Sequence, residues 1–89
     1  MSEALKAKLA ELERRFVEQA GEHRQAIAGA VATGNRQDLA ERAHKLAGIA
    51  GMFGQPEIGA AALALEEVAD SGSDPQPAAA RLIDLLGAL

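Results

Sequence analysis

The sequence predicts an all-α protein, an antiparallel up-down four-helix bundle that forms a single domain over residues 1–89. Three observations support this prediction. Alanine and leucine dominate the composition, whereas β-branched residues are few. Apolar residues recur every three or four positions in four successive segments, which is the spacing of amphipathic helices. The connections between the segments are short, and short connections place consecutive helices antiparallel.

The first predicted helix is long, from about Glu3 to Thr33. At its full length it would measure about 46 Å, whereas the later helices are about half as long. We therefore expect it either to bend near Gly21 or to carry its first turns beyond the bundle or over it. His23 fills a gap in its apolar stripe and is expected to be a partly buried boundary residue. The stripe consists of Leu5, Leu9, Leu12, Phe16, Ala20, Ile27 and Val31.

Glycine, proline and polar capping residues mark where the other helices begin and end. Gly34 can end the first helix in a left-handed conformation, and Asn35 can cap the second. The sequence FGQP separates the second helix from the third, and DSGSDPQP separates the third from the fourth, which Asp74 can cap. The predicted helices cover Arg36 to about Phe53, about Pro56 to Asp70, and a last segment that begins at Pro75.

Composition and charge exclude several classes of function. The net charge is −4, with 13 acidic and 9 basic residues, so we expect no nucleic-acid partner. No apolar run approaches the roughly 20 residues of a membrane span, so no membrane association is expected. The chain contains no cysteine and only two histidines, without an HExxH pair, which predicts no metal site. A reducing, cytoplasmic location is the natural expectation.

The second helix places His44 opposite its core face. At about 100° per residue, the apolar arc is centred roughly 160° from this histidine. The imidazole is therefore predicted to point into solvent. The predicted arc contains Leu39, Ala43, Leu46, Ile49, Ala50 and Phe53. The residues expected within about 60° of His44 are Gln37, Ala40, Glu41, Ala47, Gly48 and Gly51.

Small residues surround His44 on this face, and the glycines among them lower the stability of the helix. Each interior glycine costs a helix roughly 1 kcal/mol relative to alanine. Gly48 and Gly51 remove side-chain bulk beside the ring, so a second protein could lie against the helix and reach it. An incidental exposed histidine is the plain alternative. Because the glycines lie on the histidine face and not on the core arc, we favour an interaction site. Its docking and access residues would be Ala40, Glu41, Lys45, Ala47, Gly48 and Gly51.

The chemistry open to His44 is nucleophilic. An exposed imidazole is nucleophilic at neutral pH, and the sequence shows no Ser, Cys or carboxylate triad for it to join. The remaining possibility is covalent catalysis, in which a ring nitrogen of His44 carries a phosphoryl group. Lys45 and Arg42 flank the face and could screen a phosphate, or could be ordinary surface cations. Glu41, one turn upstream, could bond the ring, but we interpret it as a solvated charge.

The sequence AHKLAGIAGMFG, followed by LALEE on the next helix, resembles the histidine-containing phosphotransfer (HPt) domain family. The family pattern is an Ala-His pair, Leu two residues and Gly four residues after the histidine, then a hydrophobic-Gly pair at the helix end. The matching residues are Ala43, His44, Leu46, Gly48, and Phe53 with Gly54. Leu65 and Glu66 match a Leu-Glu pair that the family tends to show on the following helix.

The resemblance implies a four-helix bundle that acts as a phosphorelay intermediate. His44 would accept a phosphoryl group from an aspartyl phosphate on one response-regulator receiver domain and pass it to another. A hybrid sensor histidine kinase is an expected partner, and Mg²⁺ is expected on the receiver, with no cofactor on this chain. Many members have lysine three residues after the histidine, where this chain has Ala47. No P-loop or nucleotide box is present, so self-phosphorylation is not expected.

Two other functions remain open from the sequence. One is a non-catalytic helical adaptor in which His44 has no chemical role. The other is the dimerisation and phosphoacceptor hairpin of a histidine kinase. That hairpin usually has an acidic residue after the histidine, where this chain has Lys45, and it supplies only two helices per chain. Because four helices can complete a bundle alone, we expect a monomer. A helix-turn-helix DNA binder is disfavoured by the net charge.

Overall fold

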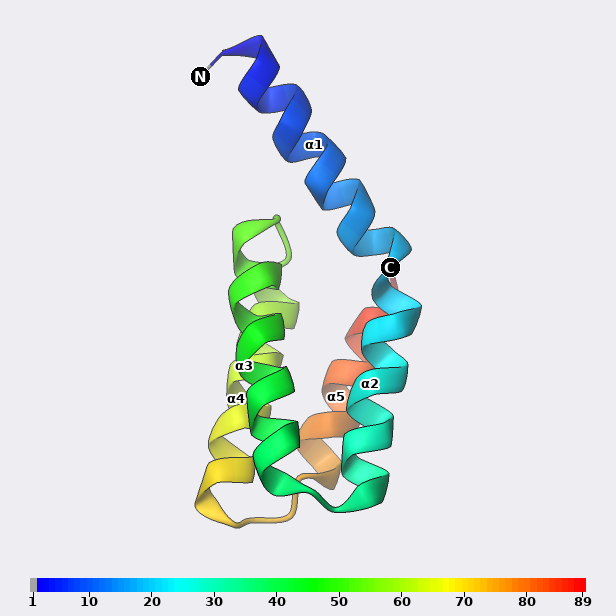
Figure 1. Cartoon of the computed structure of the whole chain (residues 1–89), viewed down its shortest axis with the longest axis vertical. Coiled ribbons are helices and arrows are strands. Elements are labelled where there is room, and N and C mark those ends of the chain that lie inside the picture. Colours follow the sequence, from blue (N-terminus) through cyan, green and yellow to red (C-terminus); the bar gives the residue numbers. More distant parts are fainter. Residues whose placement is uncertain (1) are drawn as a thin grey trace.

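The computed structural model describes residues 2–89, which form five helices connected by short turns (Figure 1). The prediction of an all-α antiparallel bundle is confirmed, with one helix more than the four expected. The helices are α1 (Glu3–Glu18), α2 (Ala20–Thr33), α3 (Arg36–Met52), α4 (Pro56–Ser71) and α5 (Gln76–Gly87).

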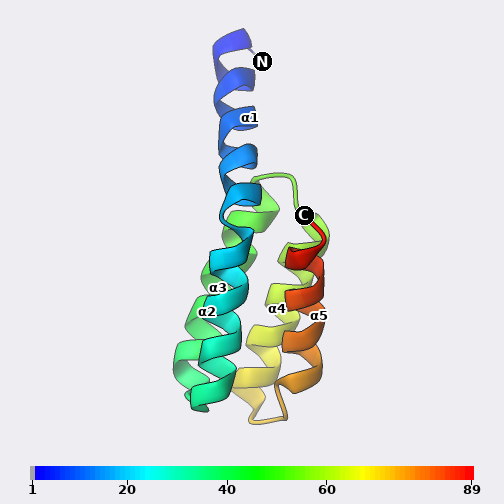
Figure 2. The ribbon, with the colours of Figure 1, turned by 90° about the vertical axis from the view of Figure 1, so that its right-hand side faces the viewer.

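Helices α2 to α5 form the bundle, and each runs antiparallel to the next (Figure 2). The contact between α3 and α4 is the most extensive, and α2 and α5 close the ring on the other side. The packing buries mainly alanine and leucine, so helices can approach closely without large side chains between them. The largest fully buried side chains are Ile27, Leu39, Leu65, Leu82 and Leu86.

The long first helix is divided at Gln19, close to Gly21, so the expected bend near that glycine is confirmed. Gln19 has φ −91° and ψ 2°, outside the helical region, whereas Gly21 lies exposed within α2. Phe16 and Ala20, on either side of the break, are both buried. The change of direction thus keeps both side chains in the core while α1 projects beyond the bundle (Figure 1). The molecule is consequently elongated, with extents of 45 × 21 × 17 Å.

The helix ends follow the predicted capping chemistry. Gly34 ends α2 with φ 73°, and the side chain of Asn35 accepts a hydrogen bond of 3.0 Å from the Asp38 amide. Asp74 accepts a similar bond from the amide of Gln76, where α5 begins. The last helix begins at Gln76, one residue after the predicted Pro75, and Pro75 itself already has helical φ −80° and ψ −9°.

Candidate functional site

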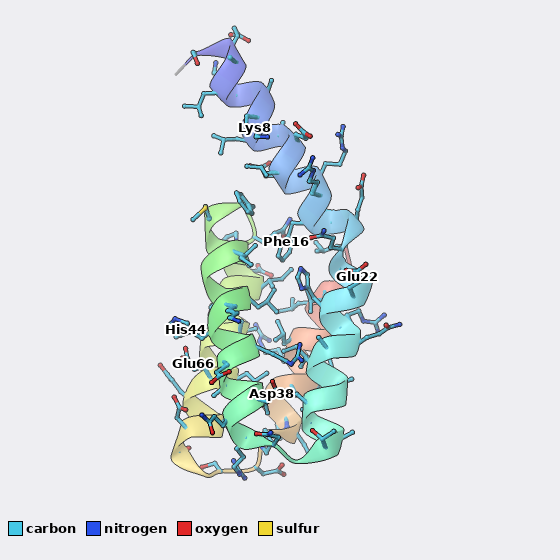
Figure 3. All side chains as sticks on the ribbon, viewed as in Figure 1. Lys8, Phe16, Glu22, Asp38, His44 and Glu66 are labelled. Atoms are coloured by element: carbon cyan, nitrogen blue, oxygen red, sulfur yellow. The ribbon has the colours of Figure 1, made fainter. Side chains whose placement is uncertain are left out.

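His44 lies near the middle of α3 and points away from the bundle (Figure 3). Its side chain is 73 % exposed. The helix holds it rigidly, because the other face of α3 is anchored by buried residues such as Ala43 and Leu46. The prediction that the imidazole points into solvent is therefore confirmed.

The core face of α3 is rotated toward α4 relative to the predicted arc. Ala40, which was expected on the open face, is buried, and Ala47 is half-buried. Ile49, which was expected in the core, is 40 % exposed. The physical reason is that α4 packs against the alanine side of α3, which makes this the most extensive helix pair. Ala40 consequently lines the bottom of a groove beside His44 and is not itself an open surface.

Glu66 of α4 bonds directly to the histidine ring (Figure 3). The His44 Nδ1 atom lies 2.9 Å from Glu66 Oε2 and 3.2 Å from Oε1. An ionised carboxylate can only accept hydrogen bonds, so Nδ1 must carry the proton. The lone pair of the neutral ring is then on Nε2. Glu66 therefore fixes which ring nitrogen keeps its lone pair free.

The position of Glu66 explains how it can bond to the His44 ring while the ring remains exposed to solvent. The Glu66 side chain is only 20 % exposed, whereas that of His44 is 73 % exposed. The carboxylate thus lies partly between α3 and α4 and reaches outward to Nδ1. The side chain of Glu41, the alternative partner considered for the ring, makes no hydrogen bond or ion pair among residues 2–89. From the sequence, Glu66 was predicted only as part of a family pattern, without a contact to His44.

An open groove between α3 and α4 contains the imidazole and several charged side chains. Lys45 lines this groove, in agreement with the prediction that it lies near His44. Arg42 does not: it forms an ion pair of 2.9 Å with Asp38 and lines a separate groove between α2 and α3. The residues of the first groove are Arg36, Gln37, Ala40, Glu41, His44, Lys45, Glu66, Ala69 and Asp70.

The glycines near His44 differ in what surrounds them. A Cβ added at Gly48 or Gly51 would meet nothing within 4 Å, so both positions are open. A Cβ at Gly59 of α4 would lie 3.3 Å from the Gly51 backbone nitrogen and 3.4 Å from the Ala47 carbonyl oxygen. Gly59 therefore permits the close approach of α4 to α3 that places Glu66 beside His44.

His23 has a structural environment, as predicted. It is half-buried and stacks on Phe16, with ring centroids 5.3 Å apart. Burial lowers its pKa below the usual 6.5, and the nearby Glu22 carboxylate opposes that shift only in part. This histidine packs at the junction of α1 and α2.

The part of the chain that the structure describes, residues 2–89, contains neither a cluster of metal-binding side chains nor a membrane-spanning helix. Within them, no three metal-binding side chains of His, Asp or Glu converge on one point. None of the five helices of this part of the chain has both the length and the apolarity needed to cross a bilayer.

The geometry agrees with one comparison with known proteins. A family model described as the Hpt domain matches residues 11–89, which include α2 to α5 and the second half of α1. No curated protein and no solved structure was found to match the chain. The matched range covers nearly the whole sequence and contains both His44 and Glu66. The chain therefore belongs to the Hpt domain family.

Proposed function

We propose that His44 accepts a phosphoryl group from the aspartyl phosphate of one receiver domain and donates it to the aspartate of another. Membership of the Hpt family implies a phosphotransfer role in a phosphorelay, and Hpt domains generally interact with receiver domains. The observation that carries the assignment to His44 is the exposed ring whose Nδ1 atom is held by Glu66. A hybrid sensor histidine kinase would be the source of the first receiver.

The transfer step follows from the protonation state that Glu66 imposes. The Nε2 lone pair attacks phosphorus in line, the new N–P bond forms, and the bond from phosphorus to the aspartyl oxygen breaks. The receiver carboxylate leaves with the bonding electron pair. The ring then carries positive charge, and its Nδ1–H donates to the Glu66 carboxylate, which stabilises that charge. Attack by a second aspartate on the phosphorus reverses these changes and returns the ring to its neutral state.

Access to the ring supports the same function. The open positions at Gly48 and Gly51 leave the surface beside the imidazole low, so a receiver domain can approach the Nε2 atom. The receiver would supply the aspartate and Mg²⁺, and this chain would supply the nucleophile in a fixed position. We propose that Glu41, Lys45 and Ala47 complete the docking surface, whereas Ala40 is buried beneath it.

Lys45 is the cation best placed to screen the transferred phosphate, because it lies next to His44 in the sequence and lines the same groove. Arg36 also lines this groove, but its guanidinium group donates a hydrogen bond to the Ser73 carbonyl oxygen. Ala47 occupies the position at which many relatives carry lysine, and its half-buried methyl group supplies no charge. Arg42 is a weaker candidate, since Asp38 already pairs with it. We infer that Lys45 takes over the screening role.

A transfer assay tests the assignment. A receiver domain carrying radiolabelled aspartyl phosphate is mixed with the chain, and the label on the chain is tested for stability in alkali and lability in acid. We expect label on the wild type and on His23→Gln, the matched histidine control, and none on His44→Gln. Equal labelling of His44→Gln would refute the proposal. A non-catalytic adaptor predicts that His44→Gln preserves partner function, so receiver binding and signalling output are measured in parallel.

A further inference from the structure

Leu63 of α4 exposes a large apolar side chain to solvent. It is 49 % exposed, whereas Leu65, the other leucine of this helix, is fully buried. The remaining exposed residues of α4 are alanine, proline or polar residues. Single exposed leucines are common on protein surfaces, so the meaning of this one depends on what lies beside it.

The pairing of α3 with α4 places Leu63 close to His44. Glu66 lies beside the histidine, and a Cβ at Gly59 would lie 3.4 Å from the Ala47 carbonyl oxygen. Leu63 is four residues after Gly59 and three before Glu66, which is about one helical turn from each. It therefore lies between the two points at which α4 meets α3, at the level of the turn of α3 that follows His44.

Leu63 projects on the same outer side of the helix pair as the imidazole. At about 100° per residue, it lies within about 60° of Glu66 and Asp70, both of which line the groove that contains His44. The buried Leu65 lies about 160° away from it around the helix. Leu63 is thus directed away from the core and toward the open side of α3 and α4, where His44 projects (Figure 3).

The part of α3 opposite Leu63 is low and uncharged. Ala47 is half-buried, and a Cβ added at the exposed Gly48 would meet nothing within 4 Å. Leu63, Ala47 and Gly48 therefore form an apolar platform beside His44, toward the end of α3. The charged residues Arg36, Glu41 and Asp70 of the groove lie on the other side of the histidine, toward the start of α3.

A partner that reaches the ring must also cover this platform. In-line transfer requires the receiver aspartate to approach the Nε2 atom of His44 directly. Specific interfaces bury about 800 Å² on each partner, far more than one imidazole ring offers. The receiver surface around the aspartate therefore extends over the residues one helical turn away from His44.

This inference rests on the proposed function: we propose that Leu63 is the apolar anchor of the receiver domain, which presents apolar side chains of its own beside its phosphoacceptor aspartate. A receiver with a charged residue at the matching position would lose hydration there and gain no partner, because the side chains of the platform carry no charge and no hydrogen-bonding group. Leu63 thus determines which receivers dock, whereas His44 and Glu66 determine the chemistry.

Single-turnover transfer over a range of receiver concentrations tests the anchor, since it separates docking from chemistry. We expect Leu63→Ala to raise the receiver concentration that gives half the maximal rate by about 3- to 10-fold, as expected for burying half of a leucine side chain. The rate at saturation should not change. Leu63→Met, which conserves volume, should behave like the wild type. Leu5→Ala is the matched control, because Leu5 is also 49 % exposed but lies on α1.

An unchanged half-saturating concentration in Leu63→Ala would overturn the proposal, as would an equal change in Leu5→Ala. A lower rate at saturation with unchanged half-saturation would also overturn it, because Leu63 would then act on the ring and not on docking. Sedimentation equilibrium of the chain alone tests a different occupant. Self-association that is lost in Leu63→Ala would assign the platform to a second copy and overturn the proposal.

Receiver binding without transfer separates this inference from the proposed function. His44→Gln carries no phosphoryl acceptor but keeps the platform, so titration calorimetry with an unphosphorylated receiver measures docking alone. We expect His44→Gln to bind the receiver, and His44→Gln with Leu63→Ala to bind it about 3- to 10-fold more weakly. If the wild type acquires no label but this difference is found, the anchor stands and the proposed function fails. If the wild type is labelled but the two variants bind equally, the anchor fails and the proposed function stands.

Discussion

Replacement of Glu66 by glutamine is the sharpest perturbation of the site short of removing the histidine. Glutamine keeps nearly the same shape but has no charge, and its amide group can either donate or accept. The 2.9 Å contact to His44 Nδ1 then no longer fixes the proton on that nitrogen, and no carboxylate stabilises the charged ring. A hydrogen bond to a charged group contributes about 1.5–3 kcal/mol. Because the His44 side chain is 73 % exposed, solvent screening reduces this contribution to about 1–2 kcal/mol.

A loss of that size corresponds to transfer slowed about 5- to 30-fold, because about 1.4 kcal/mol is a factor of ten in rate. The assay is rapid-quench transfer from a phosphorylated receiver under single-turnover conditions. Glu67→Gln is the matched control, since this neighbouring glutamate is exposed and has no contact with the ring among residues 2–89. Transfer to Glu66→Gln within twofold of the wild type would refute the role of the carboxylate, while equal slowing in Glu67→Gln would indicate a general charge effect.

The remaining predictions concern packing, access and pH. Gly48→Leu should raise the free energy of unfolding by about 0.5–1 kcal/mol, because leucine favours the helix more than glycine, and it should slow phosphoryl transfer. Gly29→Leu is the control: this position on α2 is equally open, and the change should leave the transfer rate unchanged. Normal transfer by Gly48→Leu would contradict the access argument. Gly59→Leu should lower the free energy of unfolding by about 1–3 kcal/mol in denaturant titrations, because its side chain meets the α3 backbone. An unchanged free energy of unfolding in Gly59→Leu would mean that the close approach of α3 and α4 does not depend on this glycine. Because burial lowers the pKa of His23 below 6.5, the unfolded chain binds more protons than the folded one as the pH falls past that value. The free energy of unfolding should therefore fall below about pH 6.5, and it should fall less steeply in His23→Gln. An unchanged slope in His23→Gln would exclude this source.

The sequence was sufficient for features that depend on local pattern. Helix periodicity predicted an outward His44, and the positions of Gly34 and Asn35 predicted the α2–α3 turn. These predictions succeed because a cap or a helix face depends on residues within a few positions of one another.

Features that depend on how two helices meet were missed. The bond from His44 to Glu66 joins residues 22 positions apart, and it requires the close approach of α3 and α4 at Gly59. Ala40 was predicted to be exposed and is buried, whereas Ile49 was predicted to be buried and is exposed. These errors have the same origin, because the spacing of residues along one helix does not show which side of it a neighbouring helix covers. The break at Gln19 lies close to Gly21, as the sequence predicted, and Phe16 just before it is buried.

The most direct test of the central claim is to find which ring nitrogen carries the phosphoryl group. The ¹⁵N-labelled chain is phosphorylated by a receiver domain, and nitrogen–phosphorus couplings are measured by NMR. Phosphorus coupled to Nε2 of His44, with the Nδ1 proton retained, is the predicted result. Phosphorus on Nδ1, on another residue, or on no residue of the chain would contradict the account.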